Sequence, residues 1–390
     1  MNTCSLVIRY LTSRFSSVIS NTVFFDSFQG QYSDNPKYIS QEVHRIMPDV
    51  KIVWSVSDKT REVMPDYIKK VQYGSKEYYN YALNSAAVVD NNMGIRSFGF
   101  RNFDSRMLRW ILKKPGQLAI ATWHGTPLKK IGKDQLNRSA KTFFTGIDYC
   151  IYGCDITRDA VGEAFFVKDI MRPYGSPRND QLVSEHSNEE IEALKVKLGL
   201  PLDKRIVLFA PTFRKDIGLS GLRQLDELNI KKLLLVFKAK FNQDFAFVFR
   251  AHHSVLEKTK SEGLLDQYGI IDGNIGDDMT EYLMCTDILL TDYSSCMFDI
   301  ALTDKPCFLY VPDLDHYRDD ERGMYLNFSD LPFPNALDPQ SLYSIISEFD
   351  YNLYLSKKNS FLESINNIET GEASNRVAKD IVKHINGEIS

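Results

Sequence analysis

Residues 118–134 read LAIATWHGTPLKKIGKD, an apolar run with a polar cluster directly after it. A continuous apolar run, without strict alternation, is typical of a strand buried on both faces of a parallel sheet. The polar cluster then falls at the carboxyl end of that strand, where open α/β sheets bind their ligands. This stretch therefore predicts a parallel sheet with a ligand-binding edge.

Runs of the same kind recur on both sides of this stretch and alternate with longer helical patterns. In the first half they are VFFDSF from Val23, KIVWSVS from Lys51, AAVVDN from Ala86, QLAIATWHG from Gln117 and YCIYGC from Tyr149. In the second half they are RIVLFAPT from Arg205, FAFVFRAHH from Phe245, DILLTDYSS from Asp287 and PCFLYVPD from Pro306. Two successive strand–helix alternations predict the α/β fold class with two doubly wound domains.

A turn-rich segment marks the expected boundary between these domains. YGSPRND, from Tyr174, precedes the helical pattern NEEIEALKVKLGL, from Asn188. We therefore expect an N-terminal domain over residues 1–175 and a C-terminal domain over 176–390. The last helical pattern, FLESINNIETGEASNRVAKDIVKHI, is broken by Gly371, and we expect the final helix to pack back toward the N-terminal domain.

The composition is that of a globular protein and narrows the possible partners. The chain has 390 residues, 43% hydrophobic and 25% charged, with a formal net charge of -4. That charge carries no global signal for nucleic acid, so we expect no nucleic-acid partner and only local electrostatic recognition. The six cysteines are scattered, and only Cys150 and Cys154 lie close, without a second pair to complete a zinc site. Reduced core thiols in a cytosolic protein are the simpler interpretation.

The first segment leaves open whether it contacts a membrane. No apolar run approaches the ~20 residues of a membrane span. MNTCSLVIRYLTSRFSSVIS carries Arg9 and Arg14 without an acidic residue, and lacks the apolar core and cleavage site of a signal peptide. A basic amphipathic segment on a membrane surface and an ordinary packed first helix both fit this pattern.

The cluster after residues 118–122 carries a histidine that invites two interpretations. His124 next to Gly125 is able to accept a proton from an attacking hydroxyl near neutral pH, while the glycine lets the backbone approach a ligand. A core histidine satisfied by backbone fits the residue chemistry equally well. Lys129, Lys130 and Lys133 form either a local basic patch or a solvated helix face.

A second cluster, FRAHHSV, follows the run at Phe245. Arg250 and His252 lie two residues apart, so on a strand they would point to the same face, where together they are able to neutralise a phosphate. On such a strand the adjacent His253 would point to the opposite face, so only one of the two histidines is expected to serve the site. Metal binding by these histidines is the weaker alternative, because no carboxylate or cysteine stands at ligand spacing beside them.

A third cluster, LLTDYSSCMFDIA, ends a strand and begins a helix. The hydroxyls of Ser294 and Ser295 with helix N-terminal N–H groups make a phosphate cradle, or else simply cap the helix. Other strand-end or loop residues of this type are Thr212 and Arg214 in APTFRKD, Asp292 and Arg322. The chain has no GxGxxG, P-loop or nucleophile elbow, which disfavours a nucleoside triphosphatase or a Rossmann dehydrogenase.

Taken together, these clusters resemble the CDP-glycerol glycerophosphotransferase family of teichoic acid synthesis. The matching blocks, in the family's order, are VFFDSFQGQYSDNPKYIS, TWHGTPLKKIGKD, YGSPRND, APTFR, FRAHH, LLTDYSSCMFDIALTDKPCFLY and RGMY, and the tail GEASNR resembles its closing helix motif. The blocks run from Val23 to about Tyr325, over most of the chain. Several ordered blocks are far more specific than any one of them.

The resemblance implies two Rossmann-like domains facing across a cleft, the GT-B arrangement, with the donor nucleotide mainly on the C-terminal domain. It implies that His124 is the general base, that His252 contacts the donor diphosphate, and that Ser294 and Ser295 form the diphosphate cradle. His253 stands where the family usually has proline. The remaining expected site residues are Arg250, Asp292, Thr212, Arg214 and Arg322 on the donor side, and Gly125, Thr126, Lys129 and Lys130 on the acceptor side.

The expected reaction moves glycerol phosphate from CDP-glycerol to a lipid-linked teichoic acid or capsule-type polymer and releases CMP. No metal and no cofactor other than the donor substrate are expected, because protein cations are able to offset the charge of a transferred phosphoryl group. The chain would act as a peripheral protein at the cytoplasmic face of the membrane. Alternatives are transfer of ribitol phosphate or another polyol or sugar phosphate, a GT-B glycosyltransferase using a nucleotide sugar, and a non-enzymatic scaffold of envelope assembly. The chain length suits a primase or a small polymerase.

Overall fold

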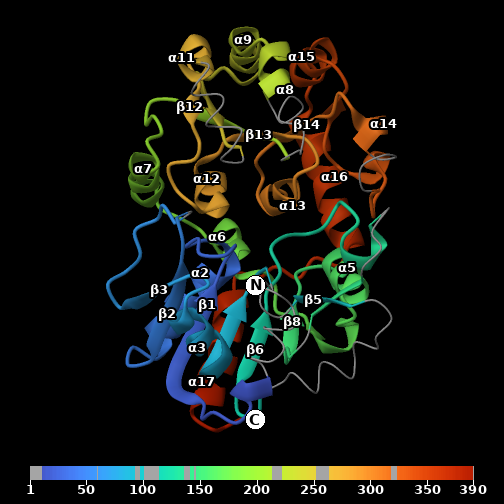
Figure 1. Cartoon of the computed structure of the whole chain (residues 1–390). Coiled ribbons are helices and arrows are strands. Elements are labelled where there is room, and N and C mark those ends of the chain that lie inside the picture. Colours follow the sequence, from blue (N-terminus) through green and yellow to red (C-terminus); the bar gives the residue numbers. More distant parts are fainter. Residues whose placement is uncertain are drawn as a thin grey trace. The chain divides into compact units, whose positions relative to one another are not determined.

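The computed structural model describes residues 11–58, 60–92, 97–100, 114–135, 141–144, 146–212, 222–251, 263–317 and 323–389. The chain forms two compact units, Met1–Val183 with Asn366–Ser390, and Ser184–Ile365 (Figure 1). The first unit therefore continues past the expected boundary at residue 175 and includes the end of the chain. The predicted class, α/β with two Rossmann-like domains, is confirmed by the sheet of each unit.

The first unit is built on a parallel sheet. Its strands, in spatial order, are β3 (Ile68–Gln72), β2 (Lys51–Val56), β1 (Ile19–Asp26), β4 (Ser85–Asp90), β6 (Leu118–Ala121), β8 (Tyr149–Ile151) and β9 (Met171–Arg172). The direction of winding reverses between β1 and β4. In a Rossmann-type sheet, ligands bind beyond the carboxyl ends of the strands at such a switch point.

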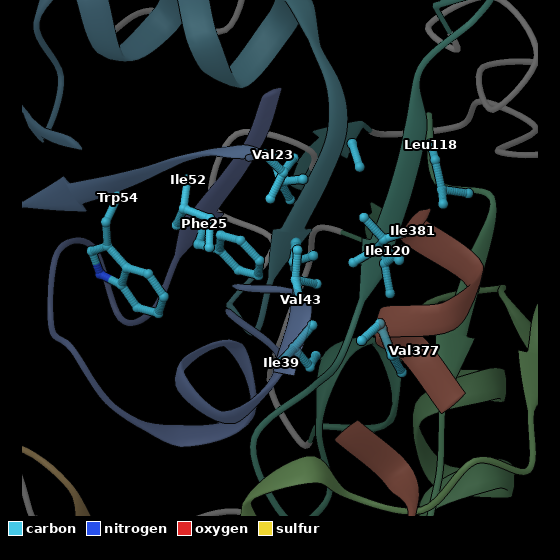
Figure 2. Close-up of a cluster of buried hydrophobic side chains, with 14 of the residues drawn as sticks. Val23, Phe25, Ile39, Val43, Ile52, Trp54, Leu118, Ile120, Val377 and Ile381 are labelled. Carbon is cyan, nitrogen blue, oxygen red and sulfur yellow. The ribbon is translucent and has the colours of Figure 1, made fainter. Parts of the chain in front are cut away.

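Alternate side chains of β1 enter two different cores. Val23 and Phe25 pack with residues of α2 (Asp34–Ile46) and α17 (Ala373–Ile385) on one face, as Figure 2 shows. Phe24 packs on the other face against α3 (Lys76–Asn84). Both faces of the sheet are thus covered, which explains why its strands read as continuous apolar runs.

The second unit repeats the plan. Its strands, in spatial order, are β12 (Ile271–Asp272), β11 (Phe245–Phe249), β10 (Arg205–Ala210), β13 (Ile288–Thr291), β14 (Cys307–Tyr310) and β15 (Asn335–Ala336). All neighbours in this sheet pair in parallel. The switch point lies between β10 and β13.

Helices and short segments complete the units. In the first they are η1 (Gly132–Asp134), α5 (Asp155–Ala164), η2 (Lys168–Ile170), η3 (Pro177–Asn179) and α6 (Asp180–Val183), with an antiparallel pair β5 (Ser97–Phe100) and β7 (Lys141–Phe144). In the second they are α7 (Asn188–Lys197), α8 (Leu222–Glu227), α9 (Ile230–Phe241), α11 (Leu264–Tyr268), α12 (Met279–Cys285), α13 (Cys296–Ile300), α14 (Leu314–His316), η6 (Phe328–Asp330), α15 (Pro339–Ser347) and α16 (Tyr351–Ser364). None of the helices in the described ranges combines the length and the apolar character that crossing a bilayer demands.

The segment expected to mark the domain boundary, residues 174–180, packs within the first unit. Arg178 and Asp180 there are 6% and 5% exposed. The break at Gly371, with φ of 80°, separates α16 in the second unit from α17 in the first. Every expected strand is present. The sequence pattern did not predict β3, β5, β7 or the two-residue strands β9, β12 and β15, because they are short or carry polar residues.

Candidate active site

His124 lies at the carboxyl edge of the first sheet, three residues after β6 ends. Its Nδ1 is 3.0 Å from the backbone oxygen of Asn91, which directly follows β4. A carbonyl oxygen only accepts, so Nδ1 carries the proton of the neutral ring and Nε2 carries the lone pair. The ring of Phe28, after β1, contacts the imidazole edge-on at 5.3 Å. The structure thus orients His124 with Nε2 as its basic nitrogen.

The surroundings keep this imidazole neutral. His124 is half-buried, and loss of hydration lowers its pKa below the ordinary value of 6.5. The hydrogen bond to Asn91 and the charge of Asp34 act in the opposite direction, while Arg178 lowers the pKa further. A neutral imidazole at physiological pH is the form that accepts a proton.

The neighbours of His124 adopt unusual backbone conformations. Gly125 has φ of 147°, which side-chain-bearing residues rarely adopt, and Trp123 has φ of 55°. The hydroxyl of Thr126 is 3.3 Å from that of Thr157, at the start of α5. Of the expected acceptor-side residues, Gly125 and Thr126 therefore lie beside His124, and the Thr126 hydroxyl faces α5. Lys129 and Lys130 follow in the same loop and are half-buried.

The sequence analysis missed the polar residues that surround His124 at this edge. Asp34, Asn91 and Arg178 are at most 6% exposed. Asp26 and Asp90 face each other at the ends of β1 and β4, and burial, followed by the charge of Asp90, raises the pKa of Asp26 well above its ordinary range. Their positions along the sequence were the available signal. Asp26 and Asp90 end apolar runs, Asn91 follows one, and Asp34 opens the next helix, whereas Arg178 has no such position.

In the second unit, Asp292 links two strand ends at the switch point. Its carboxylate is 1% exposed and accepts the backbone N–H of Thr212 at 2.7 Å and that of Tyr293. Thr212 follows β10 and Asp292 follows β13, so the aspartate fixes the two loops that flank the switch point. Two of the partners of its carboxylate are thus backbone N–H groups, one on each loop.

Ser294 and Ser295 lie in the turn between β13 and α13, and both are half-buried. Ser295 occupies the cap position of α13, yet its side chain makes no capping hydrogen bond. The simple capping role considered for it from the sequence is therefore absent. The Ser294 hydroxyl interacts with the thiol of Cys296.

The guanidinium of Arg250, an expected donor-side residue, contacts a backbone loop of the second unit. Its guanidinium donates to the backbone oxygens of Gly273 at 2.7 Å, Gly276 at 2.9 Å and Asp277 at 2.8 Å. It also stacks over the ring of Tyr282, 4.5 Å from its centroid. The side chain thus organises residues 273–277, a role that no short sequence pattern reveals.

Four residues considered in the sequence lie outside the described ranges, namely Arg214, His252, His253 and Arg322. Cys150, Cys154, Cys285, Cys296 and Cys307 are buried free thiols. Within the described parts of the chain, no three His, Cys, Asp or Glu side chains gather in a way that would hold a metal ion.

Comparison with known proteins identifies the family of the chain. The model of the CDP-Glycerol:Poly(glycerophosphate) glycerophosphotransferases matches residues 8–383. A teichoic acid poly(glycerol phosphate) polymerase of Staphylococcus epidermidis is 30% identical over 393 residues, covering 96% of this chain but 52% of the relative. A teichoic acid glycerol-phosphate transferase of Staphylococcus aureus is 28% identical, covering 93% of each chain. The solved wall teichoic acid polymerase TagF is similar with a TM-score of 0.78 at 28% identity, over 99% of this chain and 94% of that one. The chain thus spans about half the length of the first relative and nearly all of the second.

Proposed function

The chain belongs to the CDP-glycerol:poly(glycerophosphate) glycerophosphotransferase family, and on that premise we propose that it transfers glycerol phosphate from CDP-glycerol to a lipid-linked teichoic acid acceptor. One observation carries the proposal. The histidine of the WHGT block sits at a strand end with Nδ1 engaged by the Asn91 carbonyl and Nε2 as the basic nitrogen. This is the geometry of a general base for an attacking hydroxyl.

The proposed step is a single phosphoryl transfer. The terminal hydroxyl oxygen of the acceptor attacks the phosphorus that bears glycerol, and its proton passes to Nε2 of His124. The bond from that phosphorus to the CMP oxygen breaks, and CMP leaves with the bonding electron pair. Such reactions depend mainly on positioning and on electrostatic stabilisation of the phosphoryl oxygens, and protein groups are able to supply both.

The second unit is proposed to hold the donor. Ser294 and Ser295, on the turn that Asp292 and Thr212 brace, offer hydroxyls to the diphosphate. His252 remains the predicted partner of the same diphosphate. No metal is included in the proposal, so activity should persist in a strong chelator. Activity lost to the chelator and restored only by magnesium would contradict that part.

The proposed place of action is the cytoplasmic face of the membrane, where the lipid-linked acceptor is met. At the start of the described chain, Leu11 is 40% and Phe15 93% exposed, next to Arg14. Apolar and cationic side chains together favour an anionic bilayer surface. Salt-sensitive sedimentation with anionic vesicles, weakened by Phe15→Ser, tests this part.

The function is tested by following CMP release from the purified protein with a lipid acceptor. CDP-glycerol, CDP-ribitol and nucleotide sugars are supplied in turn, and CDP-glycerol should support CMP release best. His124→Ala should abolish turnover without changing the melting temperature, while His186→Ala, in the second unit, should leave it unchanged. Full activity of His124→Ala, or release of a nucleoside diphosphate from a nucleotide sugar, overturns the proposal.

A further inference from the structure

Asn91 is the centre of a buried polar network behind His124. Its side chain is fully buried. Its Oδ1 accepts the backbone N–H of Phe28 at 3.1 Å, and its Nδ2 donates to Asp34 at 2.7 Å and Ser27 at 3.0 Å. Its backbone oxygen meets Nδ1 of His124. One side chain therefore joins the loop after β1, the loop after β4 and the start of α2, and its own carbonyl reaches the loop after β6.

Asp34 anchors this network with a buried charge. It is the first residue of α2, with φ of 59°, and it is 6% exposed. Besides Asn91 Nδ2, its carboxylate accepts the N–H of Asn35 at 2.7 Å and pairs with Arg178 at 3.2 Å. A buried carboxylate needs such compensation, and removing one partner leaves the other charge or donor unsatisfied.

The adjacent Asn35 holds the residue before His124. Its Nδ2 donates to the backbone oxygen of Trp123 at 2.9 Å, and its Oδ1 accepts the N–H of Arg178 at 3.0 Å. Trp123 is in the left-handed region, which is costly for a bulky residue. The network thus restrains both the ring of His124 and the backbone that leads into it.

Backbone strain in the described residues gathers at the same edge. Four of them that are neither glycine, asparagine nor aspartate have positive φ: Phe28, Gln29, Trp123 and Phe166. Three of the four lie on the loops that this network joins. Such strain persists only where surrounding contacts over-determine the backbone, and it concentrates at functional sites.

We propose that Asp34 and Asn91 are positioning residues for His124. Their hydrogen bond fixes the Asn91 carbonyl, which in turn keeps the proton on Nδ1 and the lone pair on Nε2, aimed at the reacting hydroxyl. This inference rests on the proposed function, in which His124 is the base. It assigns a catalytic purpose to the DSFQGQYSDN block, which the chemistry of transfer otherwise leaves without a role.

Exchange of the two partners tests this proposal. Asp34→Asn and Asn91→Asp each break the donor–acceptor match, whereas the double variant restores it with the roles reversed. Each single variant should lower kcat about 10- to 100-fold with little change in KM for CDP-glycerol, since small displacements of a reacting group cost rates of that order. The double variant should recover a substantial part of kcat. Asp180→Asn, another buried aspartate of the same unit, whose carboxylate accepts two N–H groups of α17, serves as the matched control and should keep kcat.

The pH profile separates positioning from simple loss of stability. Asp34 raises and Arg178 lowers the pKa of His124. Asp34→Asn removes the negative charge and leaves Arg178 in place, so the acid limb of kcat/KM should move to lower pH. Asp180→Asn should leave that limb where it is. Single variants that keep the wild-type kcat and acid limb overturn the inference, while the proposed function stands if His124→Ala is still inactive.

If the Asp34 or Asn91 variants fail to fold, a milder substitution and the tautomer of His124 still test the proposal. Ser27→Ala removes one hydrogen bond to Asn91 and should produce a smaller fall in kcat. In NMR spectra of the ¹⁵N-histidine-labelled protein, the His124 signal is identified as the one that disappears in His124→Gln. It should show the Nδ1–H form in the wild type. In Ser27→Ala or Asp34→Asn it should show a mixture of tautomers. An Nε2–H form in the wild type, or an unchanged tautomer and kcat in Ser27→Ala, contradicts the proposal. If instead His124→Ala retains full activity, the proposed function itself fails.

Discussion

Asp180 and Ser374 lie 194 positions apart, yet the Asp180 carboxylate accepts the backbone N–H of Ser374 at 2.7 Å and that of Ala373 at 3.0 Å. These are N–H groups of the first turn of α17, which have no partner within the helix. Asp180 is buried, so no water replaces it if it is lost. A side chain near the end of the first long segment thus caps the helix with which the chain ends.

Asp180→Ala should destabilise the first unit by about 2–4 kcal/mol, because two buried N–H groups lose their acceptor. All three tryptophans fall in the first unit, so urea unfolding followed by tryptophan fluorescence reports on it. Ser75→Ala, which removes the ordinary cap of α3, should cost only about 1 kcal/mol. Equal effects of the two variants would show that the docking of α17 does not depend on Asp180.

Glu369 should make the stability of the first unit depend on pH. Burial raises its pKa from 4.5 to about 7, despite hydrogen bonds from Ser176 and Asn179. The folded chain binds this proton more tightly than the unfolded chain. The stability it contributes is therefore fully present below pH 4.5 and is lost as the pH rises through 7, by an amount on the order of 3 kcal/mol.

Glu369→Gln should remove this loss, and Glu372→Gln, at an exposed neighbour, should not. The measurement is the free energy of unfolding of each variant at pH 5, 6, 7 and 8. If the free energy of unfolding varied with pH in the same way for the wild type and Glu369→Gln, the raised pKa of Glu369 would be contradicted.

Gly30→Ala should reduce both stability and activity. Gly30 has φ of 112°, and a Cβ there would lie 2.6 Å from the backbone nitrogen of Ser57. The loop that also carries Phe28 must shift, at a cost of roughly 1–3 kcal/mol, and the packing on the His124 ring shifts with it. Gly74→Ala, at φ of 76° but with open space around it, should cost stability without changing kcat. A Gly30→Ala variant with wild-type kcat would show that the position of this loop does not affect the reaction at His124.

Arg250→Lys should affect stability more than donor binding. Lysine has one ammonium group and does not reproduce a planar fork that reaches three carbonyl oxygens. We expect a loss of about 1–3 kcal/mol, read by calorimetry, with KM for CDP-glycerol changed less than in a Ser294→Ala/Ser295→Ala variant. A large rise in KM for CDP-glycerol with an unchanged melting temperature would instead indicate that Arg250 contacts the donor phosphate.

On acidification, kcat/KM should begin to fall only below the ordinary histidine pKa of 6.5. Because desolvation lowers the pKa of His124, the neutral base persists to lower pH than 6.5. The midpoint of the acid limb of kcat/KM should therefore lie below 6.5 in the wild type. A midpoint above 6.5 would mean that another group, or a protonated His124, controls the rate.

The strand ends could be read from the sequence because both faces of each sheet are covered. That burial turns each central strand into an apolar run, and the polar residue that ends the run marks the edge. His124, Asp292 and Ser294 were found in this way. The role of Arg250 could not be found, because its partners are backbone carbonyls more than 20 residues further along the chain. A local sequence pattern shows the type of a residue but not which distant backbone carbonyl its side chain contacts.

By itself, the sequence determined two α/β units, the order of the polar blocks along the strand ends and, through those blocks, the family. These properties follow from periodicity and local turns, which short segments encode. Only the tertiary structure decided that Asp180 caps α17, the helix expected from the sequence to pack toward the N-terminal domain, and that Asn91 presents its carbonyl to His124. Those contacts join segments tens to hundreds of residues apart, and packing of the whole sheet is what brings their atoms to hydrogen-bonding distance.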